Sequence, residues 1–255
     1  MENALLVGLS RQMVLERQMD VVANNVANMN TTGFKADNAM FEEYLMPVAR
    51  ENRFQPADRV LDMVNDRGTW RNMGAGPIQQ TGNPLDVALN GDGYLVVQTP
   101  AGERYTRNGS LVINGQGQLV TADGQPVLGD NGPIVFQPTD HSVMITPDGR
   151  VTVTEAGATN TESQRGQLRI VRFAAPQQLQ KEGNNLYVAP AGVAATPDPN
   201  TKLIQGSIEK SNVSGVVEIS RLIQISRSYA QVAQLLSNQS DLHKNAISQL
   251  ANVPT

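Results

Sequence analysis

The feature that most constrains this chain is a heptad-like spacing of apolar residues at each of its two ends. Residues 3–29 contain no proline and a single glycine, and their apolar positions step alternately by four and three, at Leu15, Met19, Val22, Val26 and Met29. Such spacing lines one face of a helix or the seam of a coiled coil. The sequence therefore predicts a first helix of about 40 Å in length.

Residues 214–252 carry the same spacing at the other end of the chain. Their positions alternate by three and four, and the apolar or aromatic members of this row include Ile219, Leu222, Tyr229, Leu236 and Ile247. A second apolar row lies beside the first and contains Ile225, Val232, Leu235 and Leu242. Because the two rows face different directions on a helix, the pattern predicts partners on two sides. Such helices are marginal in isolation, so we expect them to fold on assembly.

The sequence between the two ends has a different character. From about residue 85 to residue 173, short apolar segments alternate with Asn-Gly or Asp-Gly pairs, which begin at Asn90, Asp92, Asn108, Asn114, Asp123, Asn131 and Asp148. Both residues of such a pair tolerate positive φ, which makes the pair a strong hairpin signal. The predicted strands are 85–89, 94–98, 111–113, 118–121, 134–136, 143–145, 151–154 and 168–173. A compact all-β domain is expected here.

These patterns predict an α+β chain whose central all-β domain is flanked by two helices. The expected segments are an N-terminal helix and its closing sequence (1–35), a connection without an assignable fold (36–76), the β domain (77–188), a proline-rich connector (189–205) and the C-terminal helix (206–255). Three prolines in the connector discourage regular structure.

The composition narrows the classes of function. The 255 residues include 20 basic and 24 acidic side chains and no extended basic run, so nucleic acid is not an expected partner. No cysteine is present, which excludes disulfides and thiolate chemistry. No window approaches the roughly 20 apolar residues of a membrane-spanning helix. The first residues do not resemble a cleavable signal peptide.

No motif in the sequence supports catalysis or cofactor binding. The glycine clusters at 74–76 and 91–93 lack the third glycine of a dinucleotide loop, and a calcium loop starting at Asp86 lacks its acidic ligands. The only histidines, His141 and His243, have no nucleophile elbow or metal-ligand spacing near them. We therefore expect no catalytic, cofactor or metal residue and no enzyme.

Three blocks of sequence resemble one known family. Residues 21–35 read VVANNVANMNTTGFK, residues 81–111 read TGNPLDVALNGDGYLVVQTPAGERYTRNGSL, and residues 206–218 read GSIEKSNVSGVVE. The first block closely resembles the N-terminal signature of the bacterial flagellar rod and hook proteins. The other two are similar to the start of that family's β domain and the entry to its C-terminal helix.

The resemblance implies a structural subunit of the flagellar basal-body rod, which transmits torque from the motor to the hook. Family members pack their terminal helices as an inner tube, carry β domains outside, and assemble with homologous subunits and with copies of themselves. Export through the flagellar type III apparatus, without a cleaved signal, to the periplasmic rod is implied as well.

Within the family, the length and the opening ALLVGLSRQM resemble the proximal-rod members. Distal-rod members usually carry Arg-Ala-Tyr-Glu-x-Asn in the last helix, whereas here Arg227-Ser228-Tyr229 is followed by Ala230 and Val232. A distal-rod subunit remains one alternative. A monomeric periplasmic binding module, with helices that close on each other, is an alternative of another class, and an envelope hydrolase is a third.

The candidate residues for subunit packing follow from the apolar rows and the signature: Leu15, Met19, Val22, Asn24, Asn25, Val26, Asn28, Gly33, Phe34, Ile219, Leu222, Tyr229, Leu236 and Ile247. Asparagine competes with a helix for backbone partners, so three of them near a helix end suggest hydrogen bonds that fix register. Gly33 is expected to adopt a left-handed conformation at the helix end, with Phe34 in a pocket just beyond.

Overall fold

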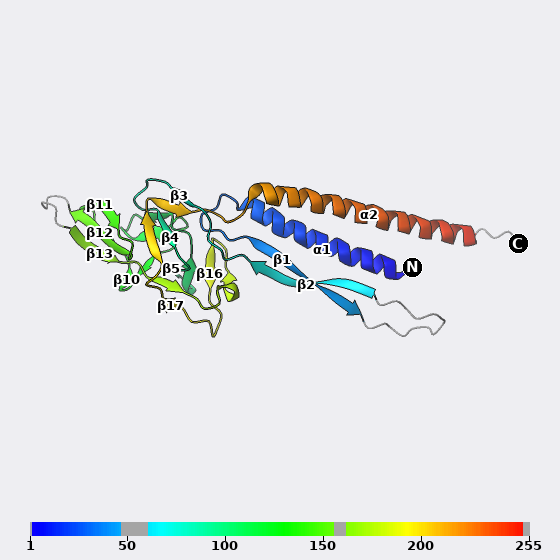
Figure 1. Ribbon diagram of the computed structural model, residues 1–255, viewed down its shortest axis with the longest axis horizontal. Coiled ribbons are helices and arrows are strands. Elements are labelled where there is room, and N and C mark those ends of the chain that lie inside the picture. The colour runs from blue at the N-terminus through cyan, green and yellow to red at the C-terminus, as the bar shows by residue number, and fades with distance from the viewer. Residues whose placement is uncertain (1, 47–60, 156–161, 252–255) are drawn as a thin grey trace. The chain divides into compact units, whose positions relative to one another are not determined.

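The computed structural model describes residues 2–46, 61–155 and 162–251, and the chain forms two compact units (Figure 1). The helical unit takes its described residues from segments 1–27, 37–71 and 214–255. The β unit takes its described residues from segments 28–36 and 72–213. Helices at both ends and strands between them confirm the predicted α+β class.

The helical unit is built on two long helices that lie side by side in Figure 1. Helix α1 spans Glu2–Ala27 and α2 spans Gly215–Ala251. Gly8 lies against Leu236, whereas Asn25 lies against Glu218, so the two helices run antiparallel. Each helix covers part of the apolar surface of the other.

A two-stranded antiparallel ribbon completes the helical unit. Strand β1 spans Asp37–Met46 and pairs with β2, which spans Leu61–Arg71, while residues 47–60 lie outside the described part of the chain. The ribbon packs beside α1 (Figure 1). Part of the segment to which the sequence assigned no fold is therefore a β ribbon.

The β unit contains short strands and one 3₁₀ turn. They are β3 (Ile78–Gln80), β4 (Val87–Asn90), β5 (Tyr94–Thr99), β6 (Gly102–Thr106), β7 (Leu111–Ile113), β8 (Leu119–Thr121), β9 (Leu128–Gly129), β10 (Gly132–Pro133), β11 (Asp140–Ile145), β12 (Arg150–Glu155), β13 (Glu162–Gln167), β14 (Ile170–Arg172), η1 (Pro176–Gln178), β15 (Gln180–Lys181), β16 (Leu186–Val188), β17 (Thr196–Pro197), β18 (Lys202–Gln205) and β19 (Ser207–Glu209).

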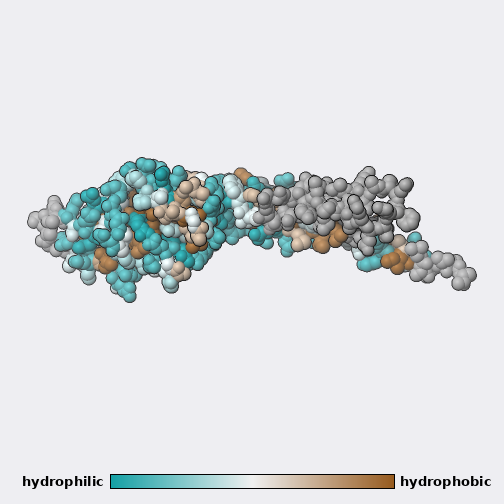
Figure 2. All heavy atoms as spheres, turned by 90° about the horizontal axis from the view of Figure 1, so that it is seen from below, coloured by the Kyte–Doolittle hydropathy of each residue, from teal (hydrophilic) through white to brown (hydrophobic). Residues whose placement is uncertain are grey.

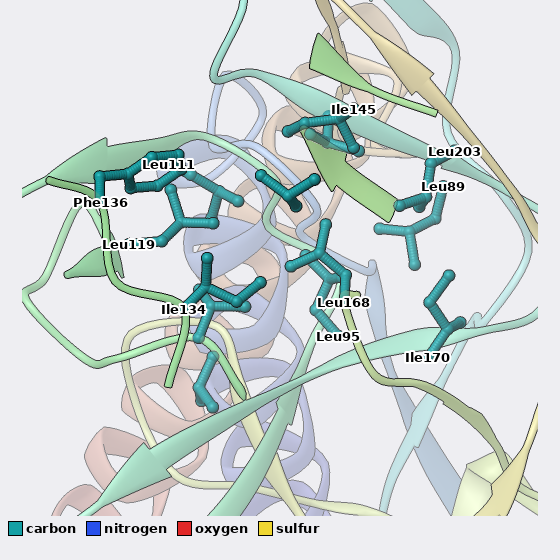
Figure 3. Close-up of a cluster of buried hydrophobic side chains, with 14 of the residues drawn as sticks. Leu89, Leu95, Leu111, Leu119, Ile134, Phe136, Ile145, Leu168, Ile170 and Leu203 are labelled. Atoms are coloured by element: carbon teal, nitrogen blue, oxygen red, sulfur yellow. The ribbon is translucent and has the colours of Figure 1, made fainter. Parts of the chain in front are cut away.

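The largest sheet of the β unit has six strands in the order β15-β16-β6-β5-β14-β17, and a second sheet has the order β11-β12-β13. Four strand pairs surround them: β3-β19, β4-β18, β7-β8 and β9-β10. Buried side chains form two apolar clusters in this unit. Figure 3 shows part of the larger one: Leu89, Leu95, Leu111, Leu119, Ile134, Phe136, Ile145, Leu168, Ile170 and Leu203.

The turn pairs have two roles rather than the single one predicted. The pairs at Asn114, Asn131 and Asp148 connect strands that pair with each other, as hairpin turns do. The pairs near Asn90 and at Asn108 instead lead into strands that join a different partner. The hairpin interpretation was therefore wrong at these two places. A backbone that tolerates positive φ also allows the chain to turn sharply from one sheet into another.

The observed segments also differ from the predicted ones. Helix α1 ends at Ala27 and α2 begins at Gly215, because the signature loop and residues 206–213 belong to the β unit. The proline-rich connector contains β17 and β18; Pro197 is tolerated because β17 is an edge strand. At 134–136 only an isolated bridge forms, through Val135.

Candidate functional site

The two helices of the helical unit meet through a small apolar core. Leu15, Val22 and Ile225 are buried in it. The partly buried side chains packed around them are Met19, Val26, Leu222, Tyr229 and Val232. Helix α1 thus contacts residues from both predicted apolar rows of α2. One partner helix covers more of α2 than the sequence suggested.

A different set of apolar side chains on the same helices remains exposed. On α1, Leu6, Leu9 and Met13 are 51, 51 and 62 % exposed and follow a three-then-four spacing. On α2, Leu235 and Leu242 are 57 and 68 % exposed and lie seven residues apart. We call these two rows the outer stripes; Figure 2 shows hydrophobic surface on this unit in brown. Apolar surface arranged in this way is typical of an interaction site.

Two of the predicted packing residues lie outside the helix-to-helix core. Ile219 is 45 % exposed, because it follows Glu218, which faces Asn25, and one residue along a helix turns the side chain by about 100°. Ile247 is 65 % exposed, since the 37 residues of α2 extend beyond the 26 residues of α1. These two residues are therefore not part of the core between α1 and α2.

Leu236 packs where the helices approach each other closely. A Cβ atom added to Gly8 would lie 2.6 Å from a methyl carbon of Leu236, far inside a normal contact distance. The single glycine of α1 therefore makes room for this leucine. The sequence identified Leu236 as a packing residue but gave no role to Gly8.

Asn25 is the central polar residue of the helical unit. Its side chain is 1 % exposed, and its Nδ2 donates to the backbone oxygen of Asp37 at 2.8 Å, while its Oδ1 accepts from the backbone nitrogen of Asp37 at 2.9 Å. Nδ2 also lies 3.3 Å from Oε2 of Glu218 on α2. One buried amide thus joins α1, β1 and α2. The hypothesis that the asparagines fix register called for such hydrogen bonds to the backbone.

The other two signature asparagines occupy different environments. Asn24 is exposed. Asn28 lies in the turn that follows α1, where its backbone oxygen accepts from the nitrogen of Thr31 at 3.1 Å and its Oδ1 accepts from the Thr31 hydroxyl at 3.2 Å. Asn28 therefore stabilises the turn that follows α1, which belongs to the β unit. Asn25 is the one of the three that is fully buried.

Gly33 and Phe34 lock the signature loop onto the β unit. Gly33 has a φ of +69°, and a Cβ atom there would lie 2.6 Å from the backbone carbon of Arg107. Phe34 is 1 % exposed, and the Lys181 ammonium lies 4.0 Å from the centre of its ring. Both positions behave as the sequence predicted: glycine permits a left-handed turn and phenylalanine fills a pocket.

A buried ionic cluster lies directly behind this loop. Lys35, Arg107 and Glu209 are 1, 3 and 1 % exposed. The Lys35 ammonium donates to Oε1 of Glu209 at 2.5 Å, and the Arg107 guanidinium donates to Oε2 at 2.9 and 2.8 Å. Burial lowers the pKa of Lys35, although the attraction of Glu209 opposes the shift. The one carboxylate therefore compensates two buried cations.

Asn212 is a residue of this region that the sequence analysis did not single out. Its Oδ1 accepts from the backbone nitrogen of Ala36 at 2.8 Å. Its Nδ2 donates to the backbone oxygens of Asn72 at 2.9 Å and of Gly74 at 3.0 Å. The only available signal was its place in the block 206–218, and its partners are too distant in sequence to be found from spacing.

A groove of about 450 Å³ runs within the helical unit between α1, β1 and α2. Its walls mix apolar residues with the polar side chains Gln18, Arg221, Gln224 and Ser228. No cluster of three or more His, Asp or Glu side chains in the described residues is placed to hold a metal ion. Among the helices described, none has the length and apolarity to cross a membrane.

Three family models match this chain. "Flagella basal body rod protein" matches residues 5–35, which include α1 and the signature loop. "Flagellar hook protein FlgE/F/G D1 domain" matches residues 88–153 in the β unit. "Flagellar basal body rod FlgEFG protein C-terminal" matches residues 204–250, which include α2. The matched residues thus lie in both units.

Similar proteins match over nearly the whole length. A flagellar basal-body rod protein FlgF from Caulobacter vibrioides is 40 % identical over 255 residues, which cover 99 % of this chain and 100 % of the relative. FlgF from Mesorhizobium japonicum is 31 % identical, with 99 % of each chain covered. The rod protein FlgG from Bacillus subtilis is 31 % identical, over 95 % of this chain and 97 % of its own.

Proposed function

This chain belongs to the family of flagellar basal-body rod proteins, and on that premise we propose that it is a structural subunit of the proximal rod. In this role it polymerises through its helical unit and transmits torque toward the hook. Its partners are homologous rod subunits and copies of itself. In this family FlgF is the proximal and FlgG the distal rod protein, and the 40 % identity to the Caulobacter FlgF against 31 % to the Bacillus FlgG favours the proximal position.

The observation that carries this proposal is the pair of outer stripes. The helices already close one apolar face against each other, yet Leu6, Leu9 and Met13 on α1 and Leu235 and Leu242 on α2 stay exposed. Full burial of such a side chain stabilises by roughly 1.5–3 kcal/mol. Burial of part of both stripes by a neighbouring subunit therefore contributes several kcal/mol, before the cost of association is subtracted.

The same role accounts for the absence of a recognised catalytic motif in the sequence. A subunit that acts by packing needs apolar stripes and fixed register, and Asn25 supplies the latter within the helical unit. We place the protein in the periplasmic part of the rod, after export by the flagellar apparatus without a cleaved signal. The family match supports the basal body as its location.

The test introduces charge into one outer stripe. In a strain that lacks this gene, the double variant Leu235→Glu/Leu242→Glu is compared with Ser237→Glu, whose exposed position on α2 lies about 150° around the helix from the stripe. We expect wild-type secretion and folding of both variants, because all three side chains are largely exposed in the single chain. Only the double variant should be missing from purified basal bodies.

Secretion into the medium is measured in parallel, in cells whose rod cannot be completed, so that a failure of export is distinguished from a failure of assembly. If the double variant enters basal bodies in the wild-type amount, the outer stripe on α2 is not a packing surface. If wild-type protein itself is absent from basal bodies, the proposed function is wrong.

A further inference from the structure

The chain crosses between the helical unit and the β unit at four places, after residues 27, 36, 71 and 213. Single connecting chains are flexible, and the structure ties these ones together inside the β unit. The side chain of Asn212, one residue before the last crossing, bonds to the residues at two others: Ala36 and Asn72.

We propose that Asn212 is a positioning residue that fastens the connecting chains into one stiff junction, backed by the buried Lys35–Glu209 pair. We call this group, Lys35, Ala36, Asn72, Glu209 and Asn212, the junction. It lies wholly within the β unit. Its mechanical role rests on the proposed function, since a rod subunit must carry torque from one unit to the other.

The hydrogen bonds of Asn212 account for the choice of residue. A side-chain amide offers one acceptor oxygen and two N–H donors. Here the oxygen faces the backbone N–H of Ala36, and the nitrogen faces the backbone oxygens of Asn72 and Gly74. An aspartate keeps the acceptor and loses both donors, while an alanine loses all three contacts. Asparagine is thus matched to its three backbone partners, which lie on two chain segments.

Backbone hydrogen bonds extend the junction in both directions. The nitrogen of Asn72 donates to the oxygen of Ala36 at 2.9 Å, so the second and third crossings are also bonded to each other. The nitrogen of Gly33 donates to the oxygen of Glu209 at 2.7 Å. Release of Asn212 should therefore loosen Ala36 and Asn72 together.

The ionic pair anchors the junction to the interior of the β unit. The Lys35 ammonium donates to the oxygen of Gly74 at 2.8 Å as well as to Glu209, and Glu209 also accepts from the nitrogen of Gly76 at 2.8 Å. A Cβ atom on Gly76 would lie 2.0 Å from the oxygen of Lys210, so the chains are in direct backbone contact here. Asn212 thus bonds to chain segments that also contact the buried Lys35–Glu209 pair.

The first test is hydrogen exchange of the purified full chain, with Asn212→Ala compared with Asn114→Ala. Asn114 is a matched control: it is also half-buried in the β unit, and its Oδ1 accepts from the backbone nitrogens of Gln116 and Gln118, both at 2.9 Å. We expect Asn212→Ala to speed exchange at Ala36 and Asn72 at least tenfold. Asn114→Ala should leave both amides at the wild-type rate.

The second test measures swimming of strains that carry each variant, in dilute and in viscous medium. We expect Asn212→Ala to lose more speed under viscous load than wild type or Asn114→Ala. Asn212→Asp should be impaired at least as much, because its second carboxylate oxygen faces the backbone oxygens of Asn72 and Gly74. If neither variant assembles, the exchange rates at 36 and 72 decide. Wild-type exchange at 36 and 72 in Asn212→Ala, or equal loss of speed in the Asn212 and Asn114 variants, overturns the inference.

The two proposals fail in different ways. Absence of wild-type protein from basal bodies defeats the proposed function, but the exchange rates at 36 and 72 still report on the junction. Wild-type load behaviour of the Asn212 variants in assembled rods defeats the mechanical inference alone.

Discussion

Replacement of Asn25 by alanine should weaken the helical unit without disturbing the β unit. The change removes two hydrogen bonds with the backbone of Asp37 and one with the carboxylate of Glu218, in a side chain that is 1 % exposed. A neutral hydrogen bond contributes about 1 kcal/mol and one with a charged partner somewhat more. The higher helix propensity of alanine returns about 0.5 kcal/mol. The expected net loss is about 2–4 kcal/mol.

The assay uses the only tryptophan of the chain, Trp70, which lies on β2 of the helical unit. Its fluorescence during urea unfolding reports on this unit alone. With a urea dependence of roughly 1–3 kcal/mol per molar, the midpoint should fall by about 1–2 M. Asn238→Ala is the control, because Asn238 is exposed on α2 and only accepts from Gln234. Its midpoint should move by less than about 0.3 M.

The β unit should keep its own unfolding transition in the Asn25 variant, because its core does not include any residue of α1. Equal midpoints for Asn25→Ala and Asn238→Ala would refute the role of Asn25 as the polar tie of three elements. A matching loss in the β unit would refute its assignment to the helical unit alone.

Three further predictions concern the β unit, each checked by urea or thermal unfolding. Glu209→Gln leaves two buried cations without a carboxylate and should cost about 3–5 kcal/mol. Hydrogen bonds from Arg165 hold the pKa of Asp140 below its ordinary value. The stability that ionised Asp140 contributes is therefore present above about pH 4 and is lost as the pH falls through the lowered folded pKa. Asp140→Asn should reduce the stability at pH 7 and weaken the dependence of stability on pH in the acid range. Gly33→Ala should cost at least about 1–3 kcal/mol through strain at positive φ, whereas Gly115→Ala, with open space at its Cβ, should not.

Those predictions have separate failure points. Near-wild-type stability of the Glu209 variant would mean that the cations are solvated in solution. An unchanged dependence of stability on acid pH in the Asp140 variant would mean that the Asp140–Arg165 interaction does not contribute to stability. Equal effects at the two glycines would contradict the close backbone approach at Gly33.

The helices and many turns could be predicted because their causes are local in sequence. The apolar spacing of α1 depends on residues three and four apart, and the turn at Asn114 depends on two adjacent residues. The β1–β2 ribbon could not be predicted, since residues 37–46 lack strict alternation of apolar and polar side chains. The ribbon is fixed by pairing and by its contact with α1.

The candidate site divides in the same way. Leu15, Val22 and Tyr229 could be found from periodicity, and Gly33 and Phe34 from the end of a helix pattern. The outer stripe of α1 was missed, because a row of three residues near an end is a weak periodic signal. The Lys35–Glu209 pair joins residues 174 positions apart, and no spacing rule reaches that far.

The presence of this chain in the rod is the central claim, and mass spectrometry of purified hook–basal bodies tests it most directly. Basal bodies from wild-type cells should contain the protein in fixed proportion to other rod subunits, and it should resist extraction that removes loosely bound proteins. A strain without the gene should lack complete rods. Complete rods in that strain, together with soluble wild-type protein outside the basal body, would contradict the account.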